Sequence, residues 1–135
     1  MDVLITPEAR REVDALTAVR PAPSAWGFLI GHKRGFRFIV EKVFPSGSSR
    51  VLPNGRLLAE LDRVWPGRII GLCAVRPGAA FKKAVLGPAW YGKLFIPMSP
   101  SAGTLVIRPF TVEFKRKFFM TRIPLVTPGR TMAHE

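Results

Sequence analysis

The stretch that decides the fold reads Arg68-Ile69-Ile70-Gly71-Leu72-Cys73-Ala74-Val75-Arg76-Pro77-Gly78. It begins after a Pro-Gly break and is apolar almost without interruption from residue 69 to residue 75. Such continuous apolar runs are typical of strands that are buried on both faces of a sheet. The stretch ends on Arg-Pro-Gly, a combination at which a strand leaves its sheet. We therefore predict a central strand over residues 68–75 and place the other elements around it.

Two helices are predicted from apolar periodicity and from capping residues. The first covers residues 7–19, where Thr6 can cap the helix, Pro7 suits its first position and apolar residues recur on one face. The second covers residues 56–64, with Asn54 as its candidate cap. Residues 79–86 predict only a weak helical turn.

The remaining apolar runs predict strands. Segments 25–32 and 36–44 flank a glycine-containing turn and are expected to form a hairpin. Further strands are expected over residues 93–98, 104–108, 110–114 and 118–126. The predicted fold class is α+β, with a mixed, mostly antiparallel β-sheet flanked by two main helices. We expect one domain over residues 1–127 and a flexible C-terminal tail over residues 128–135.

Composition limits the class of protein. The chain has 135 residues, a formal net charge of +12 and one cysteine. The excess of Lys and Arg favours an anionic partner such as nucleic acid, an acidic protein or an anionic membrane surface, although an Arg-rich coding background explains it equally well. One cysteine excludes an intrachain disulfide, and no apolar run approaches the ~18 residues that cross a bilayer. We expect a cytoplasmic protein without a cofactor.

Three segments together resemble the JAMM/MPN metalloprotease superfamily, which includes isopeptidases that remove ubiquitin-like modifiers. Segment 27–32, Gly-Phe-Leu-Ile-Gly-His, is similar to the first strand signature of the family. Segment 39–45, Ile-Val-Glu-Lys-Val-Phe-Pro, resembles its glutamate strand, and segment 69–78 resembles its metal-binding strand. The order and spacing of these segments carry the resemblance over about residues 6–107. It implies a JAMM/MPN-like, cytidine-deaminase-like architecture.

The sequence departs from this family where zinc chemistry would lie. The family uses two histidines on the metal strand, a serine and an aspartate at fixed spacing, and a glutamate as general base. The resemblance places the two histidine positions on Ala74 and Arg76, the serine on Ala84 and the aspartate on Gly87. Only Glu41 keeps the family residue type. Methyl and hydrogen side chains offer no lone pair and arginine is a permanent cation, so we expect no metal ion and no catalytic residue.

Two interpretations of Glu41 stay open. It is either a strand carboxylate that is exposed or paired with a nearby arginine, or the partner of Arg76 in an ion pair that fills a vestigial site. Other catalytic groups have little support. His134 lies in the predicted tail, His32 lies at a hairpin turn, and Cys73 has the surroundings of a small buried apolar residue.

Basic residues form three clusters that are candidates for anion binding. They are Lys33, Arg34 and Arg37; Lys82 and Lys83; and Lys115, Arg116, Lys117 and Arg122. Phenylalanines accompany the last cluster, and basic residues interleaved with aromatic ones can bind single-stranded nucleic acid by phosphate neutralisation and stacking. The alternation over residues 110–114 favours core-facing phenylalanines beside a solvated basic edge.

We expect, from the resemblance, a catalytically inactive JAMM/MPN-like domain that acts as a protein-interaction or scaffold module. Its partner would be another protein or a second copy of the chain, with Trp90-Tyr91 and Phe118-Phe119 as candidate interface residues. A basic nucleic-acid-binding protein is the alternative. A hydrolase with relocated chemistry is a third possibility, for which stoichiometric zinc in the purified protein would be the evidence.

Overall fold

The computed structural model describes residues 1–19, 25–46 and 52–126. Its helices are α1 (Pro7–Val19), α2 (Gly55–Val64) and α3 (Ala79–Val85), with a 3₁₀ turn, η1 (Pro88–Trp90). Its strands are β1 (Asp2–Ile5), β2 (Trp26–Arg34), β3 (Arg37–Pro45), β4 (Ile69–Val75), β5 (Leu94–Ser101), β6 (Thr104–Ile107), β7 (Phe110–Lys115), β8 (Lys117–Arg122) and β9 (Leu125–Val126). The predicted tail, residues 128–135, lies outside the described residues.

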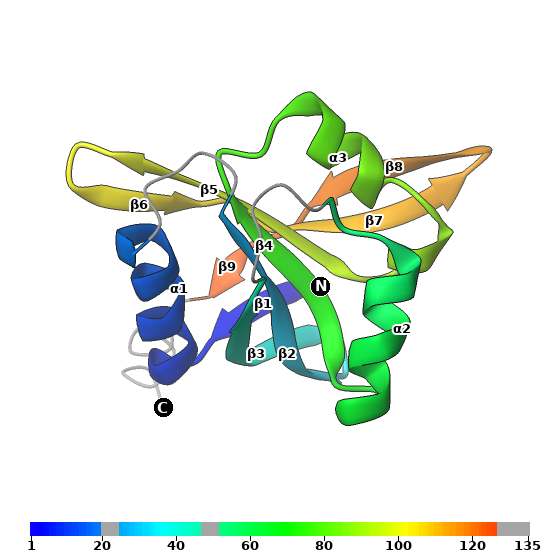
Figure 1. Ribbon diagram of the computed structural model, residues 1–135, viewed down its shortest axis with the longest axis horizontal. Helices are drawn as coiled ribbons and strands as arrows, with labels where there is room; N and C mark the ends of the chain where they lie inside the picture. The colour runs from blue at the N-terminus through cyan, green and yellow to red at the C-terminus, as the bar shows by residue number, and fades with distance from the viewer. Residues whose placement is uncertain (20–24, 47–51, 127–135) are drawn as a thin grey trace.

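All the described strands belong to one curled sheet. Eight of them follow in the order β8-β7-β5-β4-β2-β3-β1-β9, and β6 pairs with β5 outside this row. The pairs β1–β3, β1–β9 and β4–β5 are parallel, while the other pairs are antiparallel. Figure 1 shows the strands bending around a common centre instead of forming a flat layer.

The predicted fold class is therefore wrong. In the described part of the chain, strands contain more residues than helices, and three α-helices accompany a sheet curled into a half-barrel. Segments that the sequence left unassigned add to the sheet: Asp2–Ile5 pairs with β3, and β5 continues to Ser101 where a loop was expected. Strands have a right-handed twist, and this twist accumulates across a wide sheet and curls it. The sheet is therefore not a flat layer with one helix on each face.

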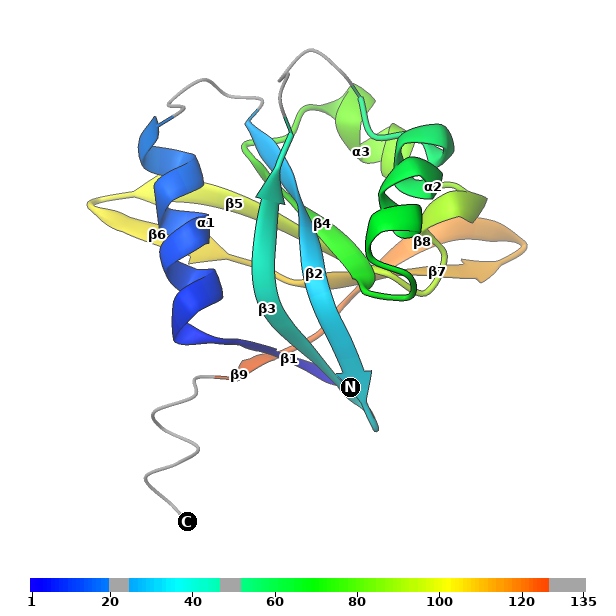
Figure 2. The same ribbon diagram turned by 60° about the horizontal axis from the view of Figure 1, so that its bottom comes forward.

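The central strand is confirmed. Every residue of β4 is buried, and the strand lies between β2 and β5. One hydrophobic cluster fills the face covered by α1 and contains Val13, Cys73 and Ile96. The other fills the face covered by α2, α3 and η1. Figure 2 shows α1 on one side of the sheet and α2 with α3 on the other.

Two glycines bring β-strands unusually close. A Cβ atom on Gly71 would lie 2.3 Å from the Leu94 carbonyl oxygen, and one on Gly31 would lie 1.9 Å from the Ile39 carbonyl oxygen. The register of β2 against β3 shifts at Gly31, so that Glu41 is the extra residue of a β-bulge. Bulges redirect side chains, and this one places the Glu41 carboxylate beside β2 and the start of β4.

The predicted helix starts are confirmed by their caps. The Thr6 hydroxyl accepts a hydrogen bond from the Ala9 N–H at 3.2 Å, and the Asn54 side chain accepts one from the Leu57 N–H at 2.8 Å. These bonds satisfy backbone donors that a helix leaves open at its first turn. No helix in the described part of the chain is long and apolar enough to cross a membrane.

Candidate functional site

A pocket of about 470 Å³ lies where β4 ends, between α3 and the β5–β6 hairpin. Alternation along β5 builds one wall, because Phe95, Pro97, Ser99 and Ser101 share a face. The same alternation continues on the next segment of chain. There Val106, Arg108 and Phe110 line the pocket, while Leu105 and Ile107 pack against the opposite core cluster.

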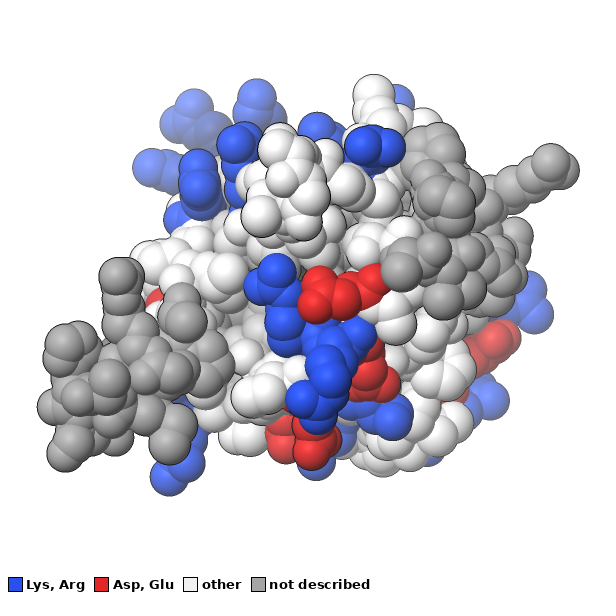
Figure 3. Space-filling model, turned by 90° about the vertical axis from the view of Figure 1, so that its left-hand side faces the viewer, with Lys and Arg blue, Asp and Glu red and all other residues white. Residues whose placement is uncertain are grey.

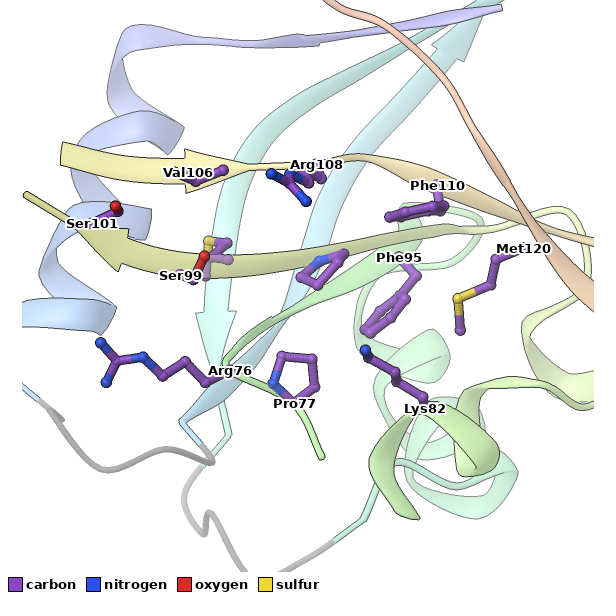
Figure 4. Close-up of a pocket in the computed structure, with 12 residues that line it drawn as sticks. Arg76, Pro77, Lys82, Phe95, Ser99, Ser101, Val106, Arg108, Phe110 and Met120 are labelled. Atoms are coloured by element: carbon purple, nitrogen blue, oxygen red, sulfur yellow. The ribbon is translucent and has the colours of Figure 1, made fainter. Parts of the chain in front are cut away.

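Three basic side chains line this pocket: Arg76, Lys82 and Arg108. They come from the end of β4, from α3 and from the β6–β7 connection, and Figure 4 shows them around β5. No Asp or Glu of the described residues lines the pocket. Among the described residues, none of the three side chains has an ion-pair or hydrogen-bond partner. The site is therefore an uncompensated cationic concavity.

Backbone hydrogen bonds hold the two arginines on opposite sides of β5. The Arg76 N–H donates to the Met98 carbonyl at 2.8 Å, and the Arg108 N–H donates to the Pro97 carbonyl at 3.3 Å. Neighbouring strands lie ~4.8 Å apart, so the two backbones are about 10 Å apart across β5. A long side chain from each side can reach a single ligand above Pro97.

Arg76 adopts a strained backbone conformation. Its φ is +45°, in the left-handed region that side chains other than glycine rarely occupy. Such strain costs roughly 1–2 kcal/mol and is common at functional sites. The conformation turns the chain out of the sheet at Pro77 and places the Arg76 side chain on the pocket wall.

The net charge of +12 is distributed unevenly over the surface. On the face in Figure 3, Lys and Arg at the upper left stand without acidic neighbours, whereas those near the centre lie beside Asp and Glu. Cationic concavities with low-dielectric walls concentrate the field and attract anions. The arrangement of the pocket thus favours an anionic ligand on electrostatic grounds.

Glu41 lies at the opposite end of β4 from this pocket. Its Oε1 atom accepts hydrogen bonds from His32 Nδ1 at 2.8 Å and from Arg68 at 2.7 Å. Arg68 also donates to the Gly31 carbonyl at 2.8 Å. The hydrogen bond from His32, with the charge of Arg68, holds the pKa of Glu41 below its ordinary value. A carboxylate with a lowered pKa is a weak general base near neutral pH.

Of the two interpretations of Glu41, the one that pairs it with Arg76 is wrong. Glu41 bonds to Arg68 at the start of β4, whereas Arg76 follows the end of the strand. Strands rise ~3.3 Å per residue, so the two arginines are separated by about 25 Å. The interpretation that Glu41 pairs with a nearby arginine holds, and that arginine is Arg68.

The family positions for zinc ligands do not come together as a metal site. Ala74 is buried in the second core cluster and pairs with Pro97 on β5. Ala84 lies on α3, and Gly87 follows that helix. With a guanidinium at Arg76 and no lone pair at the other three positions, these residues do not fit a zinc ion. In the described ranges, no three His, Cys, Asp or Glu side chains gather to hold a metal.

The three predicted basic clusters lie apart. Lys33 lies over the Phe38 ring at 5.2 Å, and Arg37 forms a salt bridge with Asp2 at 2.8 Å, near the end of the β2–β3 hairpin. Lys115, Arg116 and Lys117 form the tip of the β7–β8 hairpin, and Arg122 ends β8. Lys82 lines the pocket, but its neighbour Lys83 does not.

The predicted interface residues are only partly exposed. Trp90 was expected on the surface and is buried, with 1% of its area accessible, whereas Tyr91 is 57% exposed. Phe119 is exposed and Phe118 half-buried, with the Phe118 ring 4.8 Å from that of Phe114. Apolar surface therefore remains at the tip of the β7–β8 hairpin.

Sequence reasoning missed Arg108, Ser99 and Ser101. The two serines were assigned to a loop, and Arg108 ended a short strand without any motif. Their common face follows from the alternation described above, but their proximity to Arg76 depends on the parallel pairing of β4 with β5. Cys73 was read correctly as a small buried residue: it is fully buried, and burial raises the pKa of its thiol to about 12.

Comparisons with known proteins bear on the fold. No protein-family model matches the chain, and no curated protein matches it. The solution structure of protein DSY2949 from Desulfitobacterium hafniense is similar, with a TM-score of 0.60 and 20% sequence identity. The match covers 94% of this chain and 94% of that chain. At this identity the similarity shows a shared fold and nothing about activity.

Proposed function

We propose that this protein is a non-catalytic binding module that holds an anionic ligand in the pocket beside the end of β4. The observation that carries the proposal is that Arg76, Lys82 and Arg108 line one pocket, which no Asp or Glu of the described residues lines. An anion in the pocket would be attracted by these charges and could accept charge-assisted hydrogen bonds from them. The Ser99 and Ser101 hydroxyls add neutral hydrogen-bond donors.

The resemblance to the JAMM/MPN superfamily enters this proposal as an interpretation of Arg76. In this view, the position of a metal-binding histidine has been taken by a guanidinium, and a site that held a cation has become one that attracts anions. Binding to a protein partner, or self-association, would then follow if the partner presents the anionic group. The hydrogen bonds that Glu41 makes to His32 and Arg68 support a structural role for this carboxylate.

Phosphate titration followed by ¹H–¹⁵N NMR tests the proposal, since a chain of 15.0 kDa suits that method. We expect resonances of residues 76–82, 97–101 and 106–110 to shift together with added phosphate, and not with chloride at equal ionic strength. Arg108→Gln should weaken phosphate binding about 10-fold or more, because a hydrogen bond to a charged group contributes roughly 1.5–3 kcal/mol.

Lys83→Gln is the matched control. Lys83 adjoins Lys82 on α3 but does not line the pocket, so this variant makes the same change in net charge outside the site. It should change phosphate affinity less than about twofold at physiological salt, where charges more than ~8 Å apart are screened. Equal losses in the two variants, or shifts scattered over the surface, would contradict a defined site.

Nucleic acid binding remains the second candidate. The observation that favours it is the tip of the β7–β8 hairpin, where Lys115, Arg116 and Lys117 adjoin the paired rings of Phe114 and Phe118. Against it, the basic clusters do not form one track, and Arg37 is already neutralised by Asp2. On this second candidate function, single-stranded DNA should bind with an affinity that falls steeply as salt rises, and absence of binding at low salt would exclude it.

A further inference from the structure

The pocket has two chemically different ends. Figure 4 shows Arg76, Ser99 and Ser101 at one end and Phe95, Phe110 and Met120 at the other, with Arg108 between them. The serine hydroxyls and the Arg76 guanidinium therefore lie at one end, and the rings and the Met120 thioether lie at the other, where Lys82 lies beside Phe95. A ligand that fills both ends needs an anionic group and an apolar group.

The apolar end is partly uncovered. Phe110 and Met120 are only half-buried. Val112, which lies on β7 with Phe110 and pairs with Met120 on β8, is fully buried. α3 covers Phe95, whose ring lies 6.1 Å from that of Phe81. Aromatic and thioether groups make favourable contacts with flat rings.

The volume also exceeds what a simple anion needs. The pocket measures about 470 Å³, within the range of small-molecule sites, whereas a phosphate ion is only a few times larger than a water molecule of ~30 Å³. An extended polyanion fits less well, because Lys115, Arg116 and Lys117 lie at the far tip of a hairpin and not along this pocket.

We propose that the ligand is a phosphate ester carrying a flat ring of nucleobase size, of the nucleoside monophosphate class. Its phosphate would contact Arg76, Arg108 and the serine hydroxyls, and its ring would lie against Phe110 and Met120. Lys82 lies beside Phe95 at the ring end of the pocket. This inference rests on the anion-binding function proposed above and adds the identity of the second group.

Calorimetric titrations with five probes test the inference: inorganic phosphate, ribose phosphate, adenosine, phenyl phosphate and adenosine monophosphate. We expect adenosine monophosphate to bind about tenfold or more tightly than ribose phosphate, because stacking of a base on an aromatic side chain contributes that much. The affinity for phenyl phosphate should lie between those for ribose phosphate and adenosine monophosphate. Adenosine should bind more weakly than its monophosphate.

Two variants test where the ring of the ligand binds, and a third serves as their control. Phe110→Leu and Met120→Ala should each reduce the advantage of adenosine monophosphate over ribose phosphate while leaving the affinity for inorganic phosphate within about twofold. Phe114→Leu is the matched control, because Phe114 lies on the same face of β7 but is 53% exposed and does not line the pocket. It should leave both affinities unchanged. Melting temperatures of all three establish that each variant folds.

The possible results separate the two proposals. Absence of binding to every phosphate probe overturns the anion-binding function itself. Binding of ribose phosphate and adenosine monophosphate with equal affinity leaves that function standing and overturns the ring. Phenyl phosphate binding as tightly as adenosine monophosphate overturns the nucleobase-sized group, and adenosine binding as tightly as its monophosphate overturns the role of the phosphate.

Discussion

Replacing Arg76 with glycine should move stability and binding in opposite directions. The φ of Arg76 is +45°, which glycine adopts without strain. The backbone N–H that donates to Met98 at 2.8 Å remains in the variant. The substitution thus removes one pocket cation and one strained residue and keeps the backbone hydrogen bond. A stabilised protein that binds its ligand poorly is the expected outcome.

The magnitude follows from two opposing effects. Relief of a left-handed conformation is worth roughly 1–2 kcal/mol, and the greater freedom of glycine in the unfolded chain costs about 0.4–1 kcal/mol. The free energy of unfolding should therefore rise by about 1 kcal/mol, which raises the melting temperature of a domain of this size by about 3–5 °C. Loss of a charged hydrogen bond should weaken phosphate binding about 10-fold or more.

Arg116→Gly provides the control in the same two assays, urea unfolding and phosphate titration. Arg116 also has a positive φ, +71°, and the same charge, but it lies in the β7–β8 turn outside the pocket. It should stabilise the protein to a similar degree and leave phosphate affinity unchanged. If Arg76→Gly lowers stability, or binds phosphate as the original chain does, the reasoning about Arg76 is refuted.

Three further outcomes follow from the packing and the charges. Gly71→Ala should lower the free energy of unfolding by about 2–3 kcal/mol, because its Cβ would lie 2.3 Å from the Leu94 carbonyl, while Gly87→Ala, with open space around it, should change it by less than about 0.5 kcal/mol in urea unfolding. The pKa values of Asp2 and Glu41 are lowered by hydrogen bonds from Arg37 and His32, so the stability they contribute is present above the ordinary carboxyl pKa of ~4 and is lost as pH falls through the lowered values. The urea concentration at the unfolding midpoint should therefore decrease below about pH 4, and it should decrease less steeply in Glu41→Gln. The same pH dependence in both proteins would exclude a contribution from Glu41. Cys73, fully buried with a thiol pKa of about 12, should react with thiol reagents only in denaturant, and rapid reaction of the native protein would show that β4 opens.

Local signals in the sequence were sufficient for the elements whose chemistry is local. Helix α1 spans the residues predicted from Thr6 and Pro7, and the Asn54 cap begins α2 where it was expected. The apolar run of β4 indicated a strand buried on both faces, and all its residues are buried. In each case the deciding interactions join residues only a few positions apart, or depend on burial alone.

The sheet and the pocket depend on contacts between distant residues, which is why sequence reasoning failed there. β1 is four residues long, and it becomes a strand by pairing with Arg37–Val40, more than thirty positions away. Arg108 and Arg76 become neighbours of one pocket because β5 lies between their segments. Glu41 meets Arg68 because a bulge at Gly31 shifts the register. None of these pairings has a local signature.

The arginines at the two ends of β4 have different surroundings, and the difference supports a binding function at the end of the strand. At the start, Arg68 is compensated by Glu41 and by the Gly31 carbonyl. At the end, Arg76 is strained and shares a pocket with two other cations, and no described acidic side chain compensates it. Packing alone would favour the first arrangement, in which the cation is hydrogen-bonded to a carboxylate. Strain at Arg76 persists only because the surrounding structure enforces it, and an anionic ligand is the group that would pair with the cations there.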